Sequence, residues 1–483
     1  MKTDTIAAIA TALSDSGIGI IRISGTKAVE VADKIYRSKT GKKHLSDVKS
    51  HTIHYGFIVD NDNSVIDEVM VSVMRAPKSY TAEDTVEINC HGGILMMRKI
   101  LETVLKNGAR MAEPGEFTKR AFLNGRMDLS EAEAVMDLIH AKNEVSLKSS
   151  LKQLKGSVSE KIKDLRAKII YEIAFIESAL DDPEHISLDD YPKRLSKIMD
   201  ELLVEINKLL LSADNGKILK EGINTVIVGK PNAGKSSLLN RLAGEEKAIV
   251  TDIAGTTRDI LEEQINLNGI TLNLIDTAGI RSTEDKVEKI GVEKAKKFAN
   301  DADLIIYVVD SSVPFDENDR EIMKLIGKKK SIILLNKSDL EAVVSEEEIY
   351  GYFFENLQKG AESGEESFCE YAIHKQEPLT IIKTSTKEEN GLKEFEKAVK
   401  EMFFKGEISL DNEVFITNIR HKELLENTKE SILEVKKSME NNMPEDFYSI
   451  DLMNAYTSLG NIIGEEVSDD LMDEIFSKFC MGK

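Results

Sequence analysis

The segment Gly229 to Ser236 carries the clearest chemical signal in this sequence. It reads Gly-Lys-Pro-Asn-Ala-Gly-Lys-Ser and matches the phosphate-binding pattern Gly-x-x-x-x-Gly-Lys-Ser. Small residues let backbone N–H groups point at phosphate oxygens, and the N-terminus of the following helix adds positive potential. The Lys235 ammonium can reach the terminal phosphates, and the Ser236 hydroxyl is a suitable ligand for Mg²⁺. The segment therefore predicts a nucleotide phosphate site.

Asp276-Thr-Ala-Gly279 follows an apolar run and predicts a second part of the same site. A carboxylate at the carboxyl end of a parallel strand suits Mg²⁺, through water, and Gly279 can present its N–H to the terminal phosphate. The next residue is the apolar Ile280, where small regulatory GTPases usually carry a Gln that orients the attacking water. Glu288 offers an available carboxylate, although from its position alone a solvated helix residue is the simpler interpretation. These residues leave the water-orienting group open.

Asn336-Lys-Ser-Asp339 ends another apolar run and identifies the base. The Asp339 carboxylate can accept the two N–H donors on the edge of guanine, a pattern that adenine does not supply. Ser385 and Thr386, which follow a later apolar run, are weaker candidates for the loop behind the base. Each motif is weak alone, but in this order and context they predict a site for GTP.

The elements that must position these motifs lie between about 218 and 403. Strand-like runs at 225–228, 272–275, 304–309 and 332–335 alternate there with helical patterns. This alternation is typical of a parallel sheet with crossover helices. Within it, residues 341–370 carry nine Glu against one Lys, which indicates a solvated, loop-rich insertion.

Helical periodicity precedes and follows this α/β region. Ser130-Glu-Ala-Glu133 matches a capping box and predicts that a helix starts there. Apolar residues that recur every three or four positions predict a bundle helix with one buried stripe: Ile162, Leu165, Ile169, Ile173, Ile176 and Leu180. The pattern returns after about 405 at Leu424, Leu425, Ile432 and Val435, and in a last helix around Leu471, Ile475 and Phe476. We therefore predict that the α/β region is inserted into a helical domain.

The N-terminal segment mixes short apolar strands, such as Ile18 to Ile23 and Val69 to Met74, with one or two helices. This pattern predicts an α+β domain. The expected organisation is an α+β domain at 1–120, a first helical part at 121–217, the GTPase α/β domain at 218–403 and a second helical part at 404–483.

Composition restricts the partners and the compartment. The 483 residues carry a formal charge of -21, which opposes general attraction to RNA or anionic lipid, so an RNA partner requires a local basic patch. The Lys-rich stretch 148–168 is either such a patch or a solvated helix surface. Few, widely spaced cysteines predict neither a disulfide framework nor a zinc site, and no apolar run of membrane-spanning length occurs. We expect a cytoplasmic protein with no membrane partner.

Segments outside the nucleotide motifs give the sequence a specific resemblance. They are Asp4-Thr-Ile-Ala-Ala8, Gly19 to Gly25, Tyr80 to Glu87, His91-Gly-Gly93, Pro114 to Gly125, Thr251 to Asp259 and the terminal Phe479-Cys-Met-Gly-Lys483. Over essentially its full length the chain resembles the MnmE (TrmE) family of tRNA uridine-modifying GTPases. The resemblance implies a folate-binding type of N-terminal domain, a homodimer and a tRNA substrate.

The implied activity is K⁺-stimulated GTP hydrolysis coupled to tRNA modification. A flavin-dependent partner protein, in a heterotetramer or larger complex, would help to add an aminomethyl-type group, carboxymethylaminomethyl, to carbon 5 of the wobble uridine of certain tRNAs. A reduced folate, formyl- or methylene-tetrahydrofolate, would supply the carbon. The alternative is a regulatory GTPase that binds ribosomal RNA during ribosome assembly, although no basic Gly-x-x-Gly loop occurs after residue 400.

The resemblance also implies roles for single residues in the GTPase domain. K⁺ would be bound by Asn232, Thr251, Ile253 and Thr256 when two GTPase domains meet, and would replace an arginine finger. Thr257 would join Ser236 on Mg²⁺, and Glu288 would orient the water. The nucleotide-contacting set is then Asn232, Ala233, Gly234, Lys235, Ser236, Ser237, Thr251, Asp252, Ile253, Ala254, Gly255, Thr256, Thr257, Asp276, Thr277, Ala278, Gly279, Asn336, Lys337, Asp339, Ser385 and Thr386.

For the folate, the family positions fall on Arg22, Glu87, Arg126 and Lys483. A carboxylate can pair with the aminopyrimidine-like edge of the pterin, while cations suit the glutamate tail or a formyl oxygen. Arg126 stands where the family usually has Lys. Cys480 resembles a family cysteine that takes part in the modification as a thiolate, whereas a small apolar residue buried beside Phe479 is the structural alternative.

Overall fold

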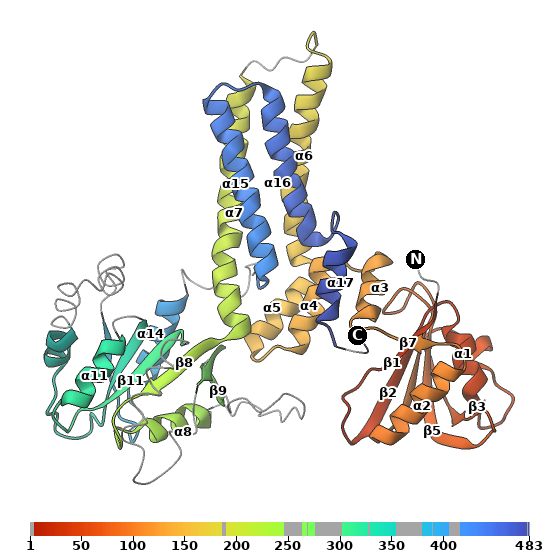
Figure 1. The fold of residues 1–483 in the computed structure, drawn as a ribbon, viewed down its shortest axis with the longest axis horizontal. Helices are drawn as coiled ribbons and strands as arrows, with labels where there is room; N and C mark the ends of the chain where they lie inside the picture. The colour runs from red at the N-terminus through yellow and green to blue at the C-terminus, as the bar shows by residue number, and fades with distance from the viewer. Residues whose placement is uncertain are drawn as a thin grey trace. The chain divides into compact units, whose positions relative to one another are not determined.

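The computed structural model describes residues 4–185, 190–245, 263–267, 269–275, 302–326, 329–353, 379–388, 390–404, 416–480 and 482. The chain divides into two compact units, both drawn in Figure 1. Unit 1 comprises Met1–Ile139, Leu151–Asp200 and Asn427–Lys483. Unit 2 comprises His140–Ser150 and Glu201–Glu426.

Unit 1 contains a seven-stranded sheet with the order β3-β4-β5-β6-β2-β1-β7. Helices α1 (Ala28–Ile35) and α2 (Ile94–Lys106) cover one face of it, as Figure 1 shows, and pack on the inward side chains of the strands. All pairings are antiparallel except that between β1 and β7, which confirms the predicted α+β character. The strands are β1 (Ile6–Ile9), β2 (Ser16–Ser24), β3 (Tyr36–Ser38), β4 (Thr52–Val59), β5 (Val65–Met74), β6 (Thr85–Gly92) and β7 (Arg110–Met111), and a 3₁₀ turn, η1, spans Leu45–Asp47.

In unit 1, α6 (Ser157–Asp181) and α16 (Glu445–Ile463) run along each other. The predicted stripe on α6 is buried from Ile162 to Ile176, but Leu180 is 43% exposed, so that part of the prediction is wrong. Leu180 lies in the last turn of the helix, where fewer neighbouring side chains cover the stripe. The other helices of this unit are α3 (Glu116–Leu123), α4 (Leu129–Ile139) and α17 (Asp469–Ser477), with parts of α7 (Tyr191–Glu221) and α15 (Ile419–Glu440).

The start of α4 differs from the prediction. Asp128 Oδ1 accepts a hydrogen bond from the Glu131 N–H at 3.0 Å, and Glu131 Oε2 accepts one from the Asp128 N–H at 2.9 Å. The capping box is therefore Asp128 with Glu131, not Ser130 with Glu133. This earlier start places Leu129 in a fully buried cluster with residues of α17. Packing thus decides between two sequence patterns that satisfy the same rule.

The last helices follow the predicted periodicity with one error. Leu425, Ile432 and Val435 of α15 are fully buried. In α17 the buried residues are Met472 and Phe476, whereas the predicted Leu471 is 36% exposed. The predicted register is therefore wrong by one residue at the start of α17.

Unit 2 contains a six-stranded sheet with the order β13-β12-β11-β8-β10-β9. In this order β13, β12, β11, β8 and β10 are each parallel to the next, as predicted. The edge strand β9 pairs antiparallel with β10 and was not predicted. The strands are β8 (Ile223–Val228), β9 (Glu263–Leu267), β10 (Ile270–Leu274), β11 (Leu304–Asp310), β12 (Lys330–Asn336) and β13 (Thr380–Lys383), and the helices include α8 (Lys235–Glu245), α11 (Glu317–Ile326) and α14 (Leu392–Phe403).

A buried amide attaches α7 to the sheet of unit 2. Asn143 Nδ2 donates hydrogen bonds to the Leu219 carbonyl in α7 at 3.2 Å and to Thr271 Oγ1 in β10 at 3.0 Å. Its Oδ1 accepts from the Ser146 N–H at 2.7 Å and caps the helix α5 (Glu144–Leu154). Strand β10 ends two residues before the predicted site residue Asp276, so this amide fixes the strand that precedes it in the sequence.

Most of the acidic stretch predicted as a loop-rich insertion lies outside the described residues. Its described start is helical at 346–353. Among the described helices, none has the length and apolar character required to cross a bilayer.

Candidate functional site

The phosphate loop follows β8 and ends where α8 begins at Lys235. Gly234 has φ +99°, and a Cβ there would lie 2.1 Å from Asn336 Nδ2. Gly229 has φ +152°, and a Cβ there would lie 2.3 Å from the Val308 carbonyl oxygen. Both glycines of the motif are therefore required by close packing on β11 and on Asn336 at the end of β12.

Lys235 is a largely buried cation at the centre of this loop. Its Nζ donates to the carbonyl oxygens of Gly229 and Lys230, both at 2.6 Å. Burial lowers the pKa of the ammonium to about 8, and within the described residues no carboxylate pairs with it. A phosphate would supply the missing negative charge, so the loop fits a nucleotide.

The other lysine of the loop has a different environment. Lys230 Nζ pairs with Asp319 Oδ2 at 2.6 Å and with Asp316 Oδ2 at 3.2 Å. Burial would lower the pKa of Lys230, but these two carboxylates outweigh burial and raise it. Lys230 thus ties the loop to the region of α11, which leaves Lys235 as the lysine available to phosphate. Sequence reasoning assigned no role to Lys230.

The predicted base-reading residues form one hydrogen-bonded group. Ser385 Oγ donates to Asp339 Oδ1 at 2.8 Å, and the Thr386 N–H donates to Asn336 Oδ1 at 3.4 Å. Asn336 Nδ2 donates to the Ala233 carbonyl at 2.8 Å, which joins the base loop to the phosphate loop. The structure therefore brings the weaker candidates Ser385 and Thr386 against the stronger ones.

Lys337 adopts φ +62°, and its Nζ lies 2.5 Å from Asp310 Oδ2 at the end of β11. Burial tends to raise the pKa of the Asp310 carboxyl, but hydrogen bonds from Lys337 and Ser312 hold it below its usual value. This ion pair fixes the middle of the base loop between two strands. At the mouth of the phosphate loop, Asn232, Ser236 and Ser237 are exposed.

Thirteen predicted residues lie outside the described part of the chain, and their positions stay predictions. They are Thr251, Asp252, Ile253, Ala254, Gly255, Thr256, Thr257, Asp276, Thr277, Ala278, Gly279, Glu288 and Lys483.

A second cluster of predicted residues surrounds Tyr80 in unit 1. Arg22 and Glu87 are cross-strand neighbours on β2 and β6, and Arg22 Nε donates to Glu87 Oε1 at 2.8 Å. The guanidinium carbons of Arg22 and Arg126 lie 5.3 Å and 4.9 Å from the centre of the Tyr80 ring. Arg126 Nη1 also donates to the Tyr80 carbonyl at 2.6 Å. The sequence analysis missed Tyr80, although it lies at the start of one of the matching segments.

The C-terminal tail reaches the same cluster. The Gly482 carbonyl accepts a hydrogen bond from Arg22 Nη1 at 3.0 Å. Gly482 has φ +89°, and a Cβ there would lie 2.4 Å from the Ile9 carbonyl oxygen, so the tail lies close against β1. Cys480 is exposed while Phe479 is buried, so the alternative of a buried, apolar cysteine is wrong.

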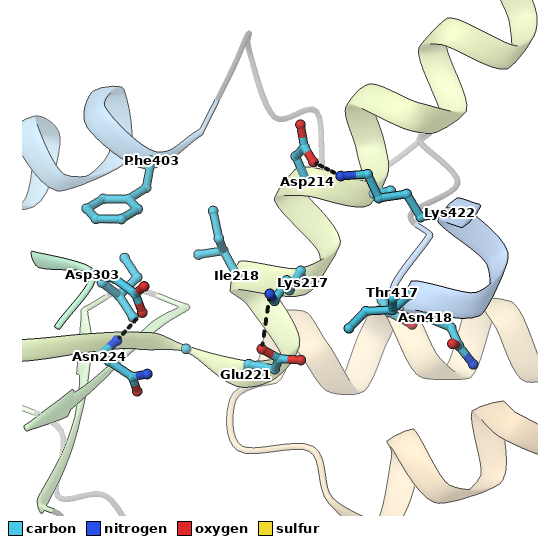
Figure 2. Close-up of a pocket in the computed structure, with 14 residues that line it drawn as sticks. Asp214, Lys217, Ile218, Glu221, Asn224, Asp303, Phe403, Thr417, Asn418 and Lys422 are labelled. Carbon is cyan, nitrogen blue, oxygen red and sulfur yellow. Dashed lines mark hydrogen bonds and ion pairs between the residues drawn. The ribbon is translucent and has the colours of Figure 1, made fainter. Parts of the chain in front are cut away.

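A cavity of about 390 Å³ in unit 2 contains none of the predicted residues. Figure 2 shows that it is lined by the end of α7, the start of β8, Phe403 and the start of α15. An ion pair of 2.8 Å joins Asp214 and Lys422 across it, and the Asn224 N–H donates to Asp303 Oδ2 at 3.0 Å. The ion pair joins α7, before the sheet of unit 2, to α15, after it, and the hydrogen bond joins β8 to the residue that precedes β11.

Comparison with known proteins adds independent findings. A family model described as the GTP-binding protein TrmE N-terminus matches residues 5–126, and one described as the MnmE helical domain matches residues 129–480. Proteins named tRNA modification GTPase MnmE are similar over their full length. That of Lachnoclostridium phytofermentans is 56% identical and that of Acetivibrio thermocellus 50% identical, each with 100% of both chains covered. That of Clostridioides difficile is 47% identical with 99% of both chains covered.

The helical-domain match spans most of the chain, and relatives of this identity align from end to end. The matched ranges include Arg22, Tyr80, Glu87 and Arg126 and both loops joined by Asn336. The chain therefore belongs to the MnmE (TrmE) family of tRNA modification GTPases.

Proposed function

We propose that the chain hydrolyses GTP and acts in the modification of tRNA. The observation that carries the proposal is the hydrogen bond of 2.8 Å from Asn336 Nδ2 to the Ala233 carbonyl. It holds the phosphate loop and the guanine-reading loop at one spacing, so a single nucleotide can occupy both. The relatives named as tRNA modification GTPases extend the proposal from the nucleotide to the RNA.

The described residues support specific roles in GTP binding. The buried Lys235 ammonium would pair with the terminal phosphates, which would offset the cost of its burial. The Asp339 carboxylate, oriented by Ser385, would accept the guanine donors. Mg²⁺ would be held by Ser236 and Thr257, with Asp276 through water, and it supplies charge neutralisation on the phosphate oxygens when bound.

We propose that K⁺ stimulates hydrolysis and that Glu288 orients the attacking water. Asn232 is the one potassium-binding candidate within the described residues, and its exposure leaves its side chain accessible to an ion. Thr251, Ile253 and Thr256 would complete the site. Because the apolar Ile280 cannot orient water, another group must do so, and Glu288 is an available carboxylate that matches the family's water-orienting residue.

A homodimer is part of the proposal. Tyr55 on β4 and Met70 on β5 are directly opposite each other in the register and are 44% and 50% exposed. The neighbouring Ile53 is 66% exposed on the same face, opposite the face covered by α1 and α2. An uncovered apolar sheet face of this kind suits a second copy of the chain.

The cluster around Tyr80 supports a reduced folate as cofactor. The site offers one carboxylate, Glu87, for a pterin edge, and two guanidinium groups, Arg22 and Arg126, for carboxylate or formyl oxygens. Lys483 would extend this set because it follows Gly482, which already contacts Arg22. Folate of the formyl- or methylene-tetrahydrofolate type would supply the transferred carbon, and Cys480 is accessible for a role in the transfer.

The remaining parts of the proposal follow from family membership. We propose a cytoplasmic complex with a flavin-dependent partner protein that modifies carbon 5 of the wobble uridine. The domain limits proposed are 1–120, 121–217, 218–403 and 404–483, with the third domain inserted into the helical one.

The decisive experiment is mass spectrometry of wobble nucleosides in tRNA from a strain that lacks this protein. Loss of the carbon-5 modification is expected. Unchanged wobble nucleosides, together with GTP-dependent sedimentation of the protein with ribosomal subunits, would instead favour the ribosome-assembly alternative. Turnover of GTP in KCl and in NaCl tests the cation: equal, slow rates would remove K⁺ from the proposal.

A further inference from the structure

A basic groove lies at the edge of the sheet in unit 1, around β3, η1 and the start of β4. It has a volume of about 470 Å³ and is lined by Lys42, Lys43, His44, Asp47, Val48, Lys49, Thr52 and His54. The three lysines are exposed, and Asp47 is the only carboxylate among the lining residues. The groove is therefore locally positive, although the whole chain carries a formal charge of -21.

The lysines of the groove are not neutralised within the protein. Among the described residues, Lys42, Lys43 and Lys49 form no ion pair with a carboxylate. The nearby Asp33 is already engaged, since its Oδ1 accepts from the Leu45 N–H at 2.5 Å and its Oδ2 lies 3.4 Å from His44 Nδ1. The groove therefore presents uncompensated positive charge to the solvent.

The floor of the groove is ordered by a short hydrogen-bond chain. Thr52 Oγ1 donates its single hydrogen to the Lys49 carbonyl at 2.6 Å. Its oxygen can therefore only accept from the His54 ring, so the His54 Nε2–H donates to Thr52 Oγ1 at 2.7 Å. His54 is buried, and burial followed by the positive charge of Lys43 lowers the pKa of its imidazole. The charge of Lys43 thus acts on the His54 imidazole at the floor of the groove. An anion bound in the groove would oppose this effect.

We propose that this groove binds the phosphodiester backbone of the tRNA substrate. The inference rests on the proposed function for the identity of the RNA. Clustered lysines neutralise backbone phosphates, and the counterions condensed on the RNA are then released. This release is the main source of affinity for RNA backbones. An acidic protein requires such a patch, because its overall field repels RNA.

A membrane surface fits the groove less well. Interfacial membrane sites combine cations with apolar side chains on one face. Here the exposed Ile53 and Tyr55 lie on the face of β4 opposite to His54, because successive strand residues alternate. The groove therefore separates its cations from the nearest exposed apolar residues.

The Lys-rich stretch 148–168 is the competing basic surface. Lys148 lies 3.9 Å from Glu144, so part of its charge is compensated by its own helix. Lys163 and Lys168 are exposed on α6 and serve with Lys148 as a matched set of three lysines.

The test measures binding of an unmodified tRNA transcript to the purified full-length protein over a series of KCl concentrations. Replacement of Lys42, Lys43 and Lys49 by Ala is expected to weaken binding about 10- to 100-fold at 0.1 M salt and to reduce the salt slope by about 2. Replacement of Lys148, Lys163 and Lys168 by Ala should leave both quantities nearly unchanged. Thermal unfolding of both variants, together with basal GTP turnover for unit 2, reports that they are folded.

A second measurement follows the His54 imidazole by NMR. Added tRNA should raise the pKa of His54, since phosphate offsets the charge of Lys43. The proposal is overturned if the groove variant binds tRNA like wild type, if wild type binds no tRNA, or if the variant loses only its binding to vesicles of phosphatidylcholine and phosphatidylserine. A groove variant that loses tRNA binding but still supports normal wobble modification in cells would overturn the proposal for the groove alone. The wobble nucleosides of the strain that lacks this protein test the proposed function separately.

Discussion

Ser385 Oγ donates a hydrogen bond to Asp339 Oδ1 at 2.8 Å, so the carboxylate that we propose reads the base is oriented by a residue 46 positions later in the chain. The connection is supported by the Thr384 carbonyl, which accepts from the Ser338 N–H at 3.1 Å. The segments that follow two neighbouring parallel strands, β12 and β13, are therefore held together as one hydrogen-bonded surface.

Asp339→Asn should weaken GTP binding and favour xanthosine nucleotides. The amide presents a donor where guanine also donates, and each charge-assisted hydrogen bond that is lost costs about 1.5–3 kcal/mol, roughly 10- to 100-fold in affinity. Competition between GTP and XTP measures the change. Ser385→Ala is the matched control, since it keeps the carboxylate and should cost only about fivefold without a change of base preference. Retained guanine preference in the Asn variant would contradict the assignment.

Gly234→Ala should abolish tight nucleotide binding. The added Cβ would lie 2.1 Å from Asn336 Nδ2 at a backbone φ of +99°, so the phosphate loop and the base loop must separate. We expect a loss of GTP affinity of more than about tenfold, from strain and displaced N–H groups. Gly17→Ala, where a Cβ meets nothing within 4 Å, should behave as wild type in the same titration. A Gly234 variant with normal affinity would show that the loop contact is dispensable.

Glu288→Ala should retain GTP binding but slow hydrolysis by about 10²- to 10⁴-fold, the usual contribution of a positioned general base. Single-turnover hydrolysis with enzyme in excess isolates the chemical step from product release. An unchanged single-turnover rate would remove Glu288 from the site.

Glu87→Gln should weaken binding of a reduced folate by about 10- to 100-fold. The substitution keeps the shape of the side chain but removes the charge that pairs with Arg22 and with a pterin edge. Isothermal titration with a tetrahydrofolate derivative measures the effect. Glu68→Gln, on the exposed face of β5, is the control and should bind as wild type. Equal affinity in both variants would exclude Glu87 from the pocket.

The pKa values of two histidines of the N-terminal sheet should be displaced in opposite directions from the ordinary value of 6.5. Asp67 Oδ1, 2.7 Å from His91 Nδ1, raises the pKa of His91, so the stabilising pair is present below 6.5 and lost as pH rises through the folded-state value. Burial, followed by Lys43, lowers the pKa of His54, so folding becomes less favourable as pH falls through 6.5. Imidazole NMR signals give both midpoints, and Asp67→Asn should lower only that of His91. Coincident midpoints in wild type would refute this description.

Local patterns were sufficient for the features whose physics is local. The phosphate loop, the base-reading motif and the alternation that makes a parallel sheet depend on neighbouring residues, and the structure confirms the sheet. The buried stripe of α6 was predictable up to Ile176 because helical period determines which side faces inward. The capping box at Asp128 was not, because two overlapping patterns satisfy the capping rule and only the packing of Leu129 distinguishes them.

By itself the sequence determined which chemical groups this protein possesses: a phosphate-loop motif, a carboxylate that we propose reads guanine, and the segments that match its family. Tertiary structure decided which of those groups meet. Only the fold pairs Lys230 with Asp319, brings Ser385 onto Asp339, gathers Arg22 and Arg126 around Tyr80 and places the Gly482 carbonyl on Arg22. These contacts join residues from 46 to 460 positions apart, and no local pattern encodes such a contact, because it depends on how whole strands and helices pack.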